Sequence, residues 1–217
     1  MFADVAMFFR IAFQFWRGFH FLRNTRRAIT VFGSARTPDD HPYCALARTV
    51  ARKIGEQGIA IVTGGGGAVM QAANQGAFES GAPSIGINIT IEREQKPNPY
   101  LTRSLICRYF FVRKVLLSRY SEAFLILPGG FGTLDECFEI ITLIQTGKMR
   151  ARPVVLIGSE FWGGLLKWCR ETLIPQGMIT EAEFSRIHLA DTAEEALFHL
   201  GIQDPNNSAT NTPTMTR

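Results

Sequence analysis

The sequence lacks the residue patterns of metal-binding and disulfide-bonded proteins. Its 217 residues include only four cysteines, which lie far apart and form no CxxC pair: Cys44, Cys107, Cys137 and Cys169. The four histidines show no metal-ligand spacing either. We therefore expect free, mostly buried thiols in a reducing, cytoplasmic compartment, with no metal and no cofactor.

Long apolar runs and a secretory signal are also missing. The longest uncharged runs are too short to span a bilayer, and Asp4 with no small-residue cleavage pattern argues against a signal peptide. The net charge of +4 arises within residues 1–30, which hold five arginines and one acid, while the remaining 18 basic and 18 acidic residues balance. We therefore expect no nucleic-acid partner and no membrane partner.

The N-terminal segment, residues 1–27, is instead rich in aromatic residues interleaved with arginines. At helical spacing one apolar stripe runs through Phe8, Ala12, Phe15, Phe19 and Leu22. This pattern predicts an amphipathic helix packed on the body of the protein or on a partner subunit. An interfacial membrane helix is the alternative.

Strand-like and helical patterns alternate over residues 28–202. The expected strands are 28–32, 59–63, 84–89, 108–112, 124–127, 154–157 and 187–190, and the expected helices are 43–56, 69–79, one from about 113, 134–145, 161–173 and 193–200. Continuous apolar strands alternating with helices predict an α/β domain, a Rossmann-like doubly wound parallel sheet with helices on both faces. Residues 203–217 are polar and are expected to form a disordered tail.

A glycine-rich turn at residues 127–136 is the most informative segment, because it carries the chain from a strand into a helix. Gly129, Gly130 and Gly132 leave room for a ligand, and the amides at a helix N-terminus attract an anion. Glu136, one turn into the helix, would face whatever the loop holds. The alternative is a capping box, in which Thr133 caps the helix and Glu136 only bonds back to the N-cap amide.

Two further turns follow strands and should lie at the same edge of the sheet. Gly64–Gly67 lack the Gly-Lys-Ser/Thr of a P-loop and fit G-x-G-x-x-G poorly. Gly33 and Ser34 follow the first strand. Arg113 and Lys114 follow the 108–112 run, so they should also reach this edge, where a guanidinium suits a phosphate or a carboxylate. Together these elements predict a pocket for a nucleotide-sized ligand.

The residues 128–136 match PGGxGTxxE, the signature of the LONELY GUY (LOG) family, and Arg113-Lys114 matches that family's Arg-Lys pair. The chain resembles the family over residues 31–200. It resembles the longer bacterial subgroup of the family in having an N-terminal helix before the first strand. The resemblance implies a homodimer or higher homo-oligomer that hydrolyses the N-glycosidic bond of nucleoside 5′-monophosphates. The implied substrates are N6-modified adenine (cytokinin) nucleotides and AMP, and the products are the free base and ribose 5-phosphate. The lysine decarboxylase label of some relatives has little support here, since no lysine lies in a recognisable cofactor-anchoring context.

Carried over residue by residue, the resemblance implies that Arg113 and Glu136 form the catalytic pair. Glu136 would stabilise the positive charge on the ribose and activate water, and Arg113 would keep Glu136 ionised by lowering its pKa. The residues assigned to phosphate and nucleotide binding are Gly33, Ser34, Gly65, Gly66, Lys114, Gly129, Gly130, Gly132, Thr133 and Asp135. A protein that binds a nucleotide or a pterin cofactor without turnover is the alternative on the same fold.

The second turn departs from the family pattern. Gly67 and Ala68 replace Pro-Gly of the GGGPG segment, and Gln71 replaces a glutamate. Ala68 brings a Cβ to a position where the family has glycine, so a different turn shape is expected. The departure leaves the preferred base open.

Overall fold

Seven parallel strands form one sheet in the computed structural model, which describes residues 2–90 and 96–202. The tail expected at 203–217 lies outside the described residues. The elements in chain order are α1 (Phe2–Leu22), β1 (Ala28–Phe32), α2 (Pro42–Gly55), β2 (Ala60–Thr63), α3 (Val69–Glu79), β3 (Ser84–Ile89), β4 (Arg103–Cys107), α4 (Phe110–Arg119), β5 (Ala123–Ile126), α5 (Phe131–Gln145), β6 (Val154–Ile157), α6 (Ser159–Trp168), a π-helical turn η1 (Cys169–Leu173), α7 (Glu181–Phe184), β7 (Ile187–Ala190) and α8 (Ala193–Leu200).

The strand order is β4-β3-β2-β1-β5-β6-β7, and every pairing is parallel. The predicted Rossmann-like fold is therefore confirmed. The chain reverses its direction across the sheet between β1 and β5, whose last residues, Phe32 and Ile126, are paired in register. In open α/β sheets the loops that leave the carboxyl ends of strands at such a reversal enclose a crevice.

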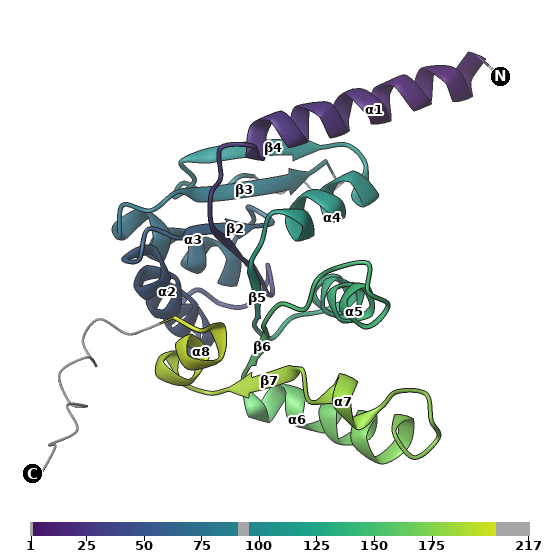
Figure 1. Cartoon of the computed structure of the whole chain (residues 1–217). Helices are drawn as coiled ribbons and strands as arrows, with labels where there is room; N and C mark the ends of the chain where they lie inside the picture. The colour runs from purple at the N-terminus through teal and green to yellow at the C-terminus, as the bar shows by residue number, and fades with distance from the viewer. Residues whose placement is uncertain (1, 91–95, 203–217) are drawn as a thin grey trace, which may run out of the picture.

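Helices cover both faces of the sheet, and each face has its own hydrophobic core (Figure 1). On one face α2, α3 and α8 pack on side chains such as Leu125; on the other α1, α4, α5 and α6 pack on side chains such as Phe124. Successive side chains of a strand point to opposite faces, so a strand buried on both sides is largely apolar, and its buried polar residues, such as Thr30 of β1 and Asn88 of β3, form hydrogen bonds.

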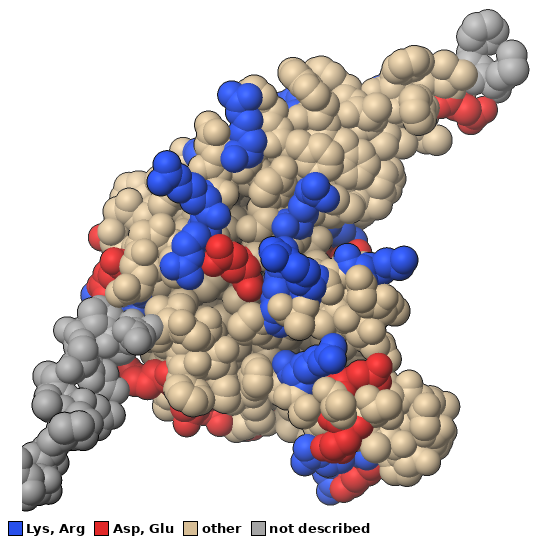
Figure 2. Space-filling view, in the orientation of Figure 1, with Lys and Arg blue, Asp and Glu red and all other residues tan. Residues whose placement is uncertain are grey.

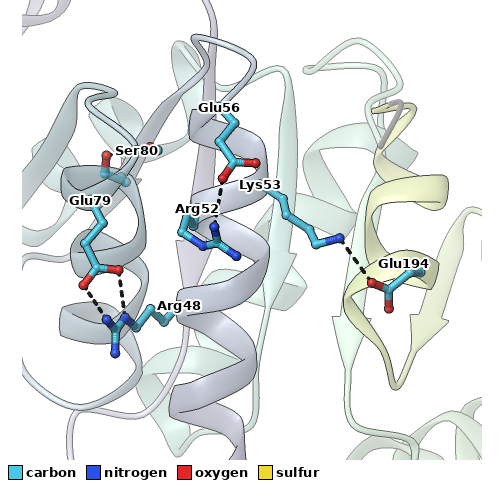
Figure 3. Close-up of polar contacts among 8 residues, drawn as sticks. Arg48, Arg52, Lys53, Glu56, Glu79, Ser80 and Glu194 are labelled. Carbon is cyan, nitrogen blue, oxygen red and sulfur yellow. Dashed lines mark hydrogen bonds and ion pairs between the residues drawn. The ribbon is translucent and has the colours of Figure 1, made fainter. Parts of the chain in front are cut away.

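The pair formed by α2 and α3 depends on one close backbone approach. A Cβ at Gly76 of α3 would lie 2.1 Å from the carbonyl oxygen of Arg48 in α2. Beside this contact Arg48 pairs with Glu79 of α3 at 2.6 Å, and on the other side of α2 Lys53 pairs with Glu194 of α8 at 3.3 Å (Figure 3). Exposed ion pairs contribute little stability, so the glycine contact and the apolar core hold these helices together.

The strand predicted at 108–112 is wrong, because the strand lies at 103–107 and α4 begins at Phe110. Burial in β4 alternates as expected for an edge strand: Leu105 and Cys107 are buried and Ile106 is exposed. The polar residues on the exposed face of this edge strand interrupt the apolar pattern that predicts a strand, whereas the aromatic run after it has the pattern of a buried strand. Phe110 is in fact exposed on the surface of α4.

Only the C-terminal half of α1 packs on the body, where it contacts α4 and β4. Leu22 is fully buried, Phe15 is half-buried, and a Cβ at Gly18 would lie 2.4 Å from the side chain of Leu116. The N-terminal half extends beyond the sheet (Figure 1), so Phe8, expected in the packed stripe, is 65% exposed. Among the described residues, no helix combines the length and apolar character needed to cross a bilayer.

Candidate active site

A cavity of about 420 Å³ opens at the carboxyl edge of the sheet, beside the reversal between β1 and β5. Its volume falls in the usual range for small-molecule sites. The lining residues come from the end of β1 and the turn after it, the turn after β2, the helices α3 and α4, and the turn into α5 with its first residues: Phe32, Gly33, Ser34, Ala35, Arg36, Gly64, Met70, Arg113, Gly130, Phe131, Gly132, Thr133 and Glu136.

The start of α5 has the geometry of an anion site. Gly130 is the N-cap residue, and its carbonyl accepts the N–H groups of Thr133 and Leu134 at 2.9 and 3.0 Å. The N–H groups of Phe131 and Gly132 therefore precede the first intrahelical bond. A Cβ at Gly130 or Gly132 would meet nothing within 4 Å, so this helix end is open to a ligand that needs N–H donors.

Glu136 does not cap α5. The helix begins at Phe131, so Thr133 lies inside the first turn and is not the N-cap residue. The Glu136 side chain is buried, and its Oε2 has no hydrogen-bond partner among the described residues. The capping-box alternative is therefore wrong, and the carboxylate faces the cavity without a structural hydrogen bond to hold it.

Glu136 and Arg113 meet across the cavity wall, with Arg113 Nη1 3.9 Å from Glu136 Oε1. Burial raises the pKa of Glu136 from 4.5 to about 7, although Arg113 and Lys114 act in the opposite direction. Arg113 thus lowers the pKa of Glu136 as expected, but the expectation that it keeps Glu136 ionised is wrong, because desolvation outweighs the attraction of the guanidinium. A carboxylate that titrates near neutral pH suits proton transfer.

The Arg113 side chain is held from both sides. Its Nε donates a hydrogen bond to the carbonyl of Ile87 in β3 at 2.8 Å. A Cβ at Gly64 would lie 2.3 Å from Arg113 Nη2, so the glycine turn after β2 provides the space through which the guanidinium passes. Burial lowers the pKa of Arg113.

Three buried asparagines support the second glycine turn. Asn88 Nδ2 donates to the carbonyl of Gly65 at 3.1 Å, and Asn98 Nδ2 donates to the carbonyl of Gly66 at 3.0 Å and to Asn74 Oδ1 at 2.9 Å. Gly65 has φ +72°, a conformation that favours glycine. Both glycines therefore shape the turn from beneath the cavity. The asparagines are dispersed in the sequence, and no motif indicates them.

Ala68 retains a glycine-type backbone even though it carries a side chain. It has φ 53° and ψ −124° and is the N-cap residue of α3. Among the described residues it is the only non-glycine with positive φ. The turn thus keeps a glycine-type conformation at this position, and the alanine is strained there.

The first and third turns are joined directly. The N–H of Ser34 donates to the carbonyl of Pro128 at 3.0 Å. A Cβ at Gly129 would lie 2.1 Å from Thr133 Oγ1 and 3.0 Å from the Ser34 nitrogen, so this glycine permits the close approach. A Cβ at Gly33 would collide with Val69. Gly33 and Gly129 therefore set the loop geometry, whereas Gly130 and Gly132 leave space.

Lys114 and Asp135 lie outside the cavity lining. Lys114 Nζ is 2.8 Å from Asp135 Oδ2 and 3.2 Å from Glu139 Oε2, so these side chains link α4 to α5 next to the Arg113–Glu136 pair. Their assignment to nucleotide binding stays a prediction.

The lining residues that the sequence analysis did not assign to the site include Phe32, Ala35, Arg36, Met70 and Phe131. Phe131 is 91% exposed at the first position of α5. It occupies the variable position of the PGGxGTxxE segment, which gives no signal by itself. An exposed phenylalanine in a lining of glycines is the kind of group on which a flat ring can stack.

Known proteins similar to this chain were found by sequence. A family model described as possible lysine decarboxylase matches residues 70–200. A cytokinin riboside 5′-monophosphate phosphoribohydrolase from Rhodococcoides fascians is 29% identical over 179 residues, covering 81% of this chain and 89% of that protein. The cytokinin riboside 5′-monophosphate phosphoribohydrolase LOG3 of Arabidopsis thaliana is 30% identical over 176 residues, covering 78% of this chain and 79% of that protein.

Solved structures share the fold. The X-ray structure of TM1055 superposes with a TM-score of 0.63 at 23% identity, covering 81% of this chain and 98% of that one. The molybdenum cofactor carrier protein of Chlamydomonas reinhardtii superposes with a TM-score of 0.59 at 21% identity, covering 81% and 96%. At these identities the likeness concerns the arrangement of helices and strands, not the ligand.

Proposed function

The chain belongs to the LOG family, and from that membership we propose that it hydrolyses the N-glycosidic bond of AMP and of N6-modified adenosine 5′-monophosphates. The products are the free base and ribose 5-phosphate. The observation that carries the proposal is the buried, uncapped carboxylate of Glu136 beside Arg113, in a cavity bordered by an open helix N-terminus.

The 5′-phosphate binds at the start of α5 in this proposal. The N–H groups of Phe131 and Gly132 supply donors, and the Thr133 hydroxyl lies in the same turn. The 5′-phosphate is remote from the glycosidic bond that breaks. The binding energy of the phosphate therefore serves to orient the ribose over Glu136.

Glu136 acts at the anomeric carbon. When the base leaves, positive charge develops on the ribose ring, and a nearby carboxylate stabilises it. The same carboxylate accepts a proton from the water that attacks this carbon, and the proton then passes to the departing base, which takes the electrons of the glycosidic bond and leaves neutral. Arg113 holds the negative charge of Glu136 in place through the 3.9 Å contact, while its bond to the Ile87 carbonyl fixes the guanidinium. Phe131 and Met70 offer apolar surface to the base.

The test is a panel of nucleoside 5′-monophosphates scored for free base and ribose 5-phosphate, with each matching nucleoside as the control. AMP and N6-modified AMP should be cleaved, and adenosine should be a poor substrate because the helix start then has no anion to bind. Equal cleavage of AMP and adenosine would contradict the phosphate role.

Binding without turnover is the alternative that the sequence leaves open, for a nucleotide or for a pterin-type cofactor. Saturable AMP binding with no base released from any nucleotide of the panel would favour it. The uncapped Glu136 supports hydrolysis, because a binding site for an anion gains nothing from a second negative charge in its wall.

We also propose that the functional unit is a homodimer or a higher homo-oligomer assembled through α1 and α4. Large apolar side chains are exposed on these two helices: Val5, Met7, Phe8, Phe9, Phe13, Trp16, Phe110, Phe111 and Val115. A whole aromatic side chain has a surface of about 150–250 Å², so the exposed surface of these side chains together is on the order of 600–1,000 Å². That matches the roughly 800 Å² that each subunit contributes to a stable interface.

A further inference from the structure

A groove rich in arginine lies at the amino edge of the sheet, opposite the candidate active site. One hollow of about 490 Å³ is bordered by the connections that precede β1, β5 and β6, and a second of about 600 Å³ adjoins it. The two share Arg119, Tyr120, Arg150 and Arg152. Figure 2 shows Lys and Arg side chains gathered over these connections.

The lining of the groove carries more basic than acidic side chains. Its lining contains five cations, namely Arg26, Arg119, Lys148, Arg150 and Arg152, and one acid, Glu122. Glu122 is paired with Arg27 at 2.9 Å, just outside the lining, so its charge is already neutralised. The groove therefore holds a surplus of positive charge in a concave space.

The cations of the groove differ in how many contacts they already make within the protein. Arg152 donates to the carbonyls of Ser118, Arg119 and Ser121 at the end of α4, so it is a structural group. The Arg119 guanidinium lies 5.4 Å from the centre of the Phe19 ring, which positions it beside the groove without neutralising it. Arg26, Lys148 and Arg150 are exposed.

We propose that this groove binds a small anion carrying two or more phosphate groups. One guanidinium group can donate two parallel hydrogen bonds to the oxygens of a phosphate. Several such groups around one hollow therefore suit a ligand with several phosphates better than a ligand with a single carboxylate. The source of the phosphates, an inorganic polyphosphate or a nucleoside polyphosphate, is left to the experiment.

The shape of the groove favours a small ligand over a nucleic acid or a membrane. A duplex or a bilayer would contact a ridge or a flat surface over many charges. Here the cations line two adjoining hollows that share the end of α4, and the end of α5 borders the second of them. A compact ligand can enter such hollows, whereas an extended one reaches only their rim.

The groove is distinct from the candidate active site but shares two elements with it. Arg113 and Glu136 lie near the N-terminal ends of α4 and α5, whereas Arg119 ends α4 and Lys148 and Arg150 follow α5. Helices of 10 and 15 residues place their ends about 15–22 Å apart. A ligand in the groove would therefore contact both helices that carry the catalytic pair without entering the cavity.

The test measures binding of sodium tripolyphosphate and of ATP to the full chain by titration calorimetry at fixed salt. The triple variant Arg26→Ala, Lys148→Ala, Arg150→Ala removes exposed cations of the groove. The matched control removes three exposed cations elsewhere, Lys167→Ala, Arg170→Ala and Arg186→Ala. We expect saturable binding by the wild type and the control, and binding about 10²–10³-fold weaker in the triple variant, since each lost contact is a charge-assisted hydrogen bond.

The outcomes separate the possibilities. Equal binding of tripolyphosphate and ATP supports an inorganic polyphosphate as the source, and tighter binding of ATP supports a nucleotide. Unchanged binding in the triple variant, no saturable binding, or tighter binding of a single-stranded oligonucleotide or of anionic vesicles would overturn the proposal. The triple variant should keep its basal AMP hydrolysis, so loss of the groove ligand is distinguishable from failure of the proposed reaction.

Discussion

Arg113 and Glu136 face each other from two different helices, α4 and α5, with Nη1 3.9 Å from Oε1. The contact is too long for a hydrogen bond, and Oε2 of the carboxylate has no partner among the described residues. The Ile87 carbonyl holds the Arg113 guanidinium, so the position of the pair is set by its neighbours and not by a direct hydrogen bond between the two side chains.

Replacing Glu136 by Gln should lower base release from AMP by a factor of about 10²–10⁴, the usual range for a lost acid–base group. AMP binding should persist, because the helix start that holds the phosphate is unchanged. The control is Glu139→Gln, since Glu139 lies on the same helix but pairs with Lys114. Near-wild-type turnover in Glu136→Gln would refute the role of the carboxylate.

The activity should depend on pH through Glu136. Because burial raises its pKa to about 7, the ionised base should form only as the pH approaches neutrality. The value of kcat/KM for AMP should therefore rise between pH 5.5 and 8 with a midpoint of about 7. A rate that is already at its plateau at pH 5.5 would show that Glu136 ionises at its ordinary pKa.

The same shift should appear in the stability of the protein. The pKa is higher in the folded than in the unfolded state, so the contribution of Glu136 is fully present below pH 4.5 and is lost as the pH rises through about 7. Relative to Glu136→Gln, the wild type should lose on the order of 1–3 kcal/mol of unfolding free energy over this range. Denaturant titrations of both proteins at pH 4.5 and 8 measure the difference.

Arg113→Ala should reduce turnover strongly, and Arg113→Lys should not restore it. A lysine ammonium cannot both donate to the Ile87 carbonyl and present a planar fork toward Glu136. Arg108→Ala, which removes an exposed arginine just before α4, is the control and should be nearly neutral. Full rescue by lysine would mean that the site needs only a positive charge.

Ala68→Gly should stabilise the protein. The alanine adopts φ 53°, and relief of this strain should exceed the entropy gained by the unfolded chain, for a net gain of about 1 kcal/mol. The melting temperature should rise by about 2–4 °C in a chain of this size. Ala72→Gly, within α3, is the control and should lower the melting temperature, because glycine is a poor helix former.

The α/β architecture and the glycine turn before α5 follow from local patterns in the amino-acid sequence. Strands buried on both faces, such as 123–126 and 154–157, are apolar at every position, and Gly130 and Gly132 mark a turn with no side chain in the way of a ligand. These signals are local, so they survive without knowledge of the neighbours. The edge strand 103–107 has only one buried face, and its weak signal led to the wrong strand at 108–112.

The role of Glu136 and the direction of its pKa shift, by contrast, depend on the tertiary structure. Glu136 has the same spacing from Thr133 whether it caps a helix or faces a cavity, and only the start of α5 at Phe131 separates the two. The direction of its pKa shift depends on how much water the surrounding elements exclude, which outweighed the nearby Arg113. The space around the Arg113 guanidinium, left by Gly64, likewise exists only because residues far apart in the chain pack together.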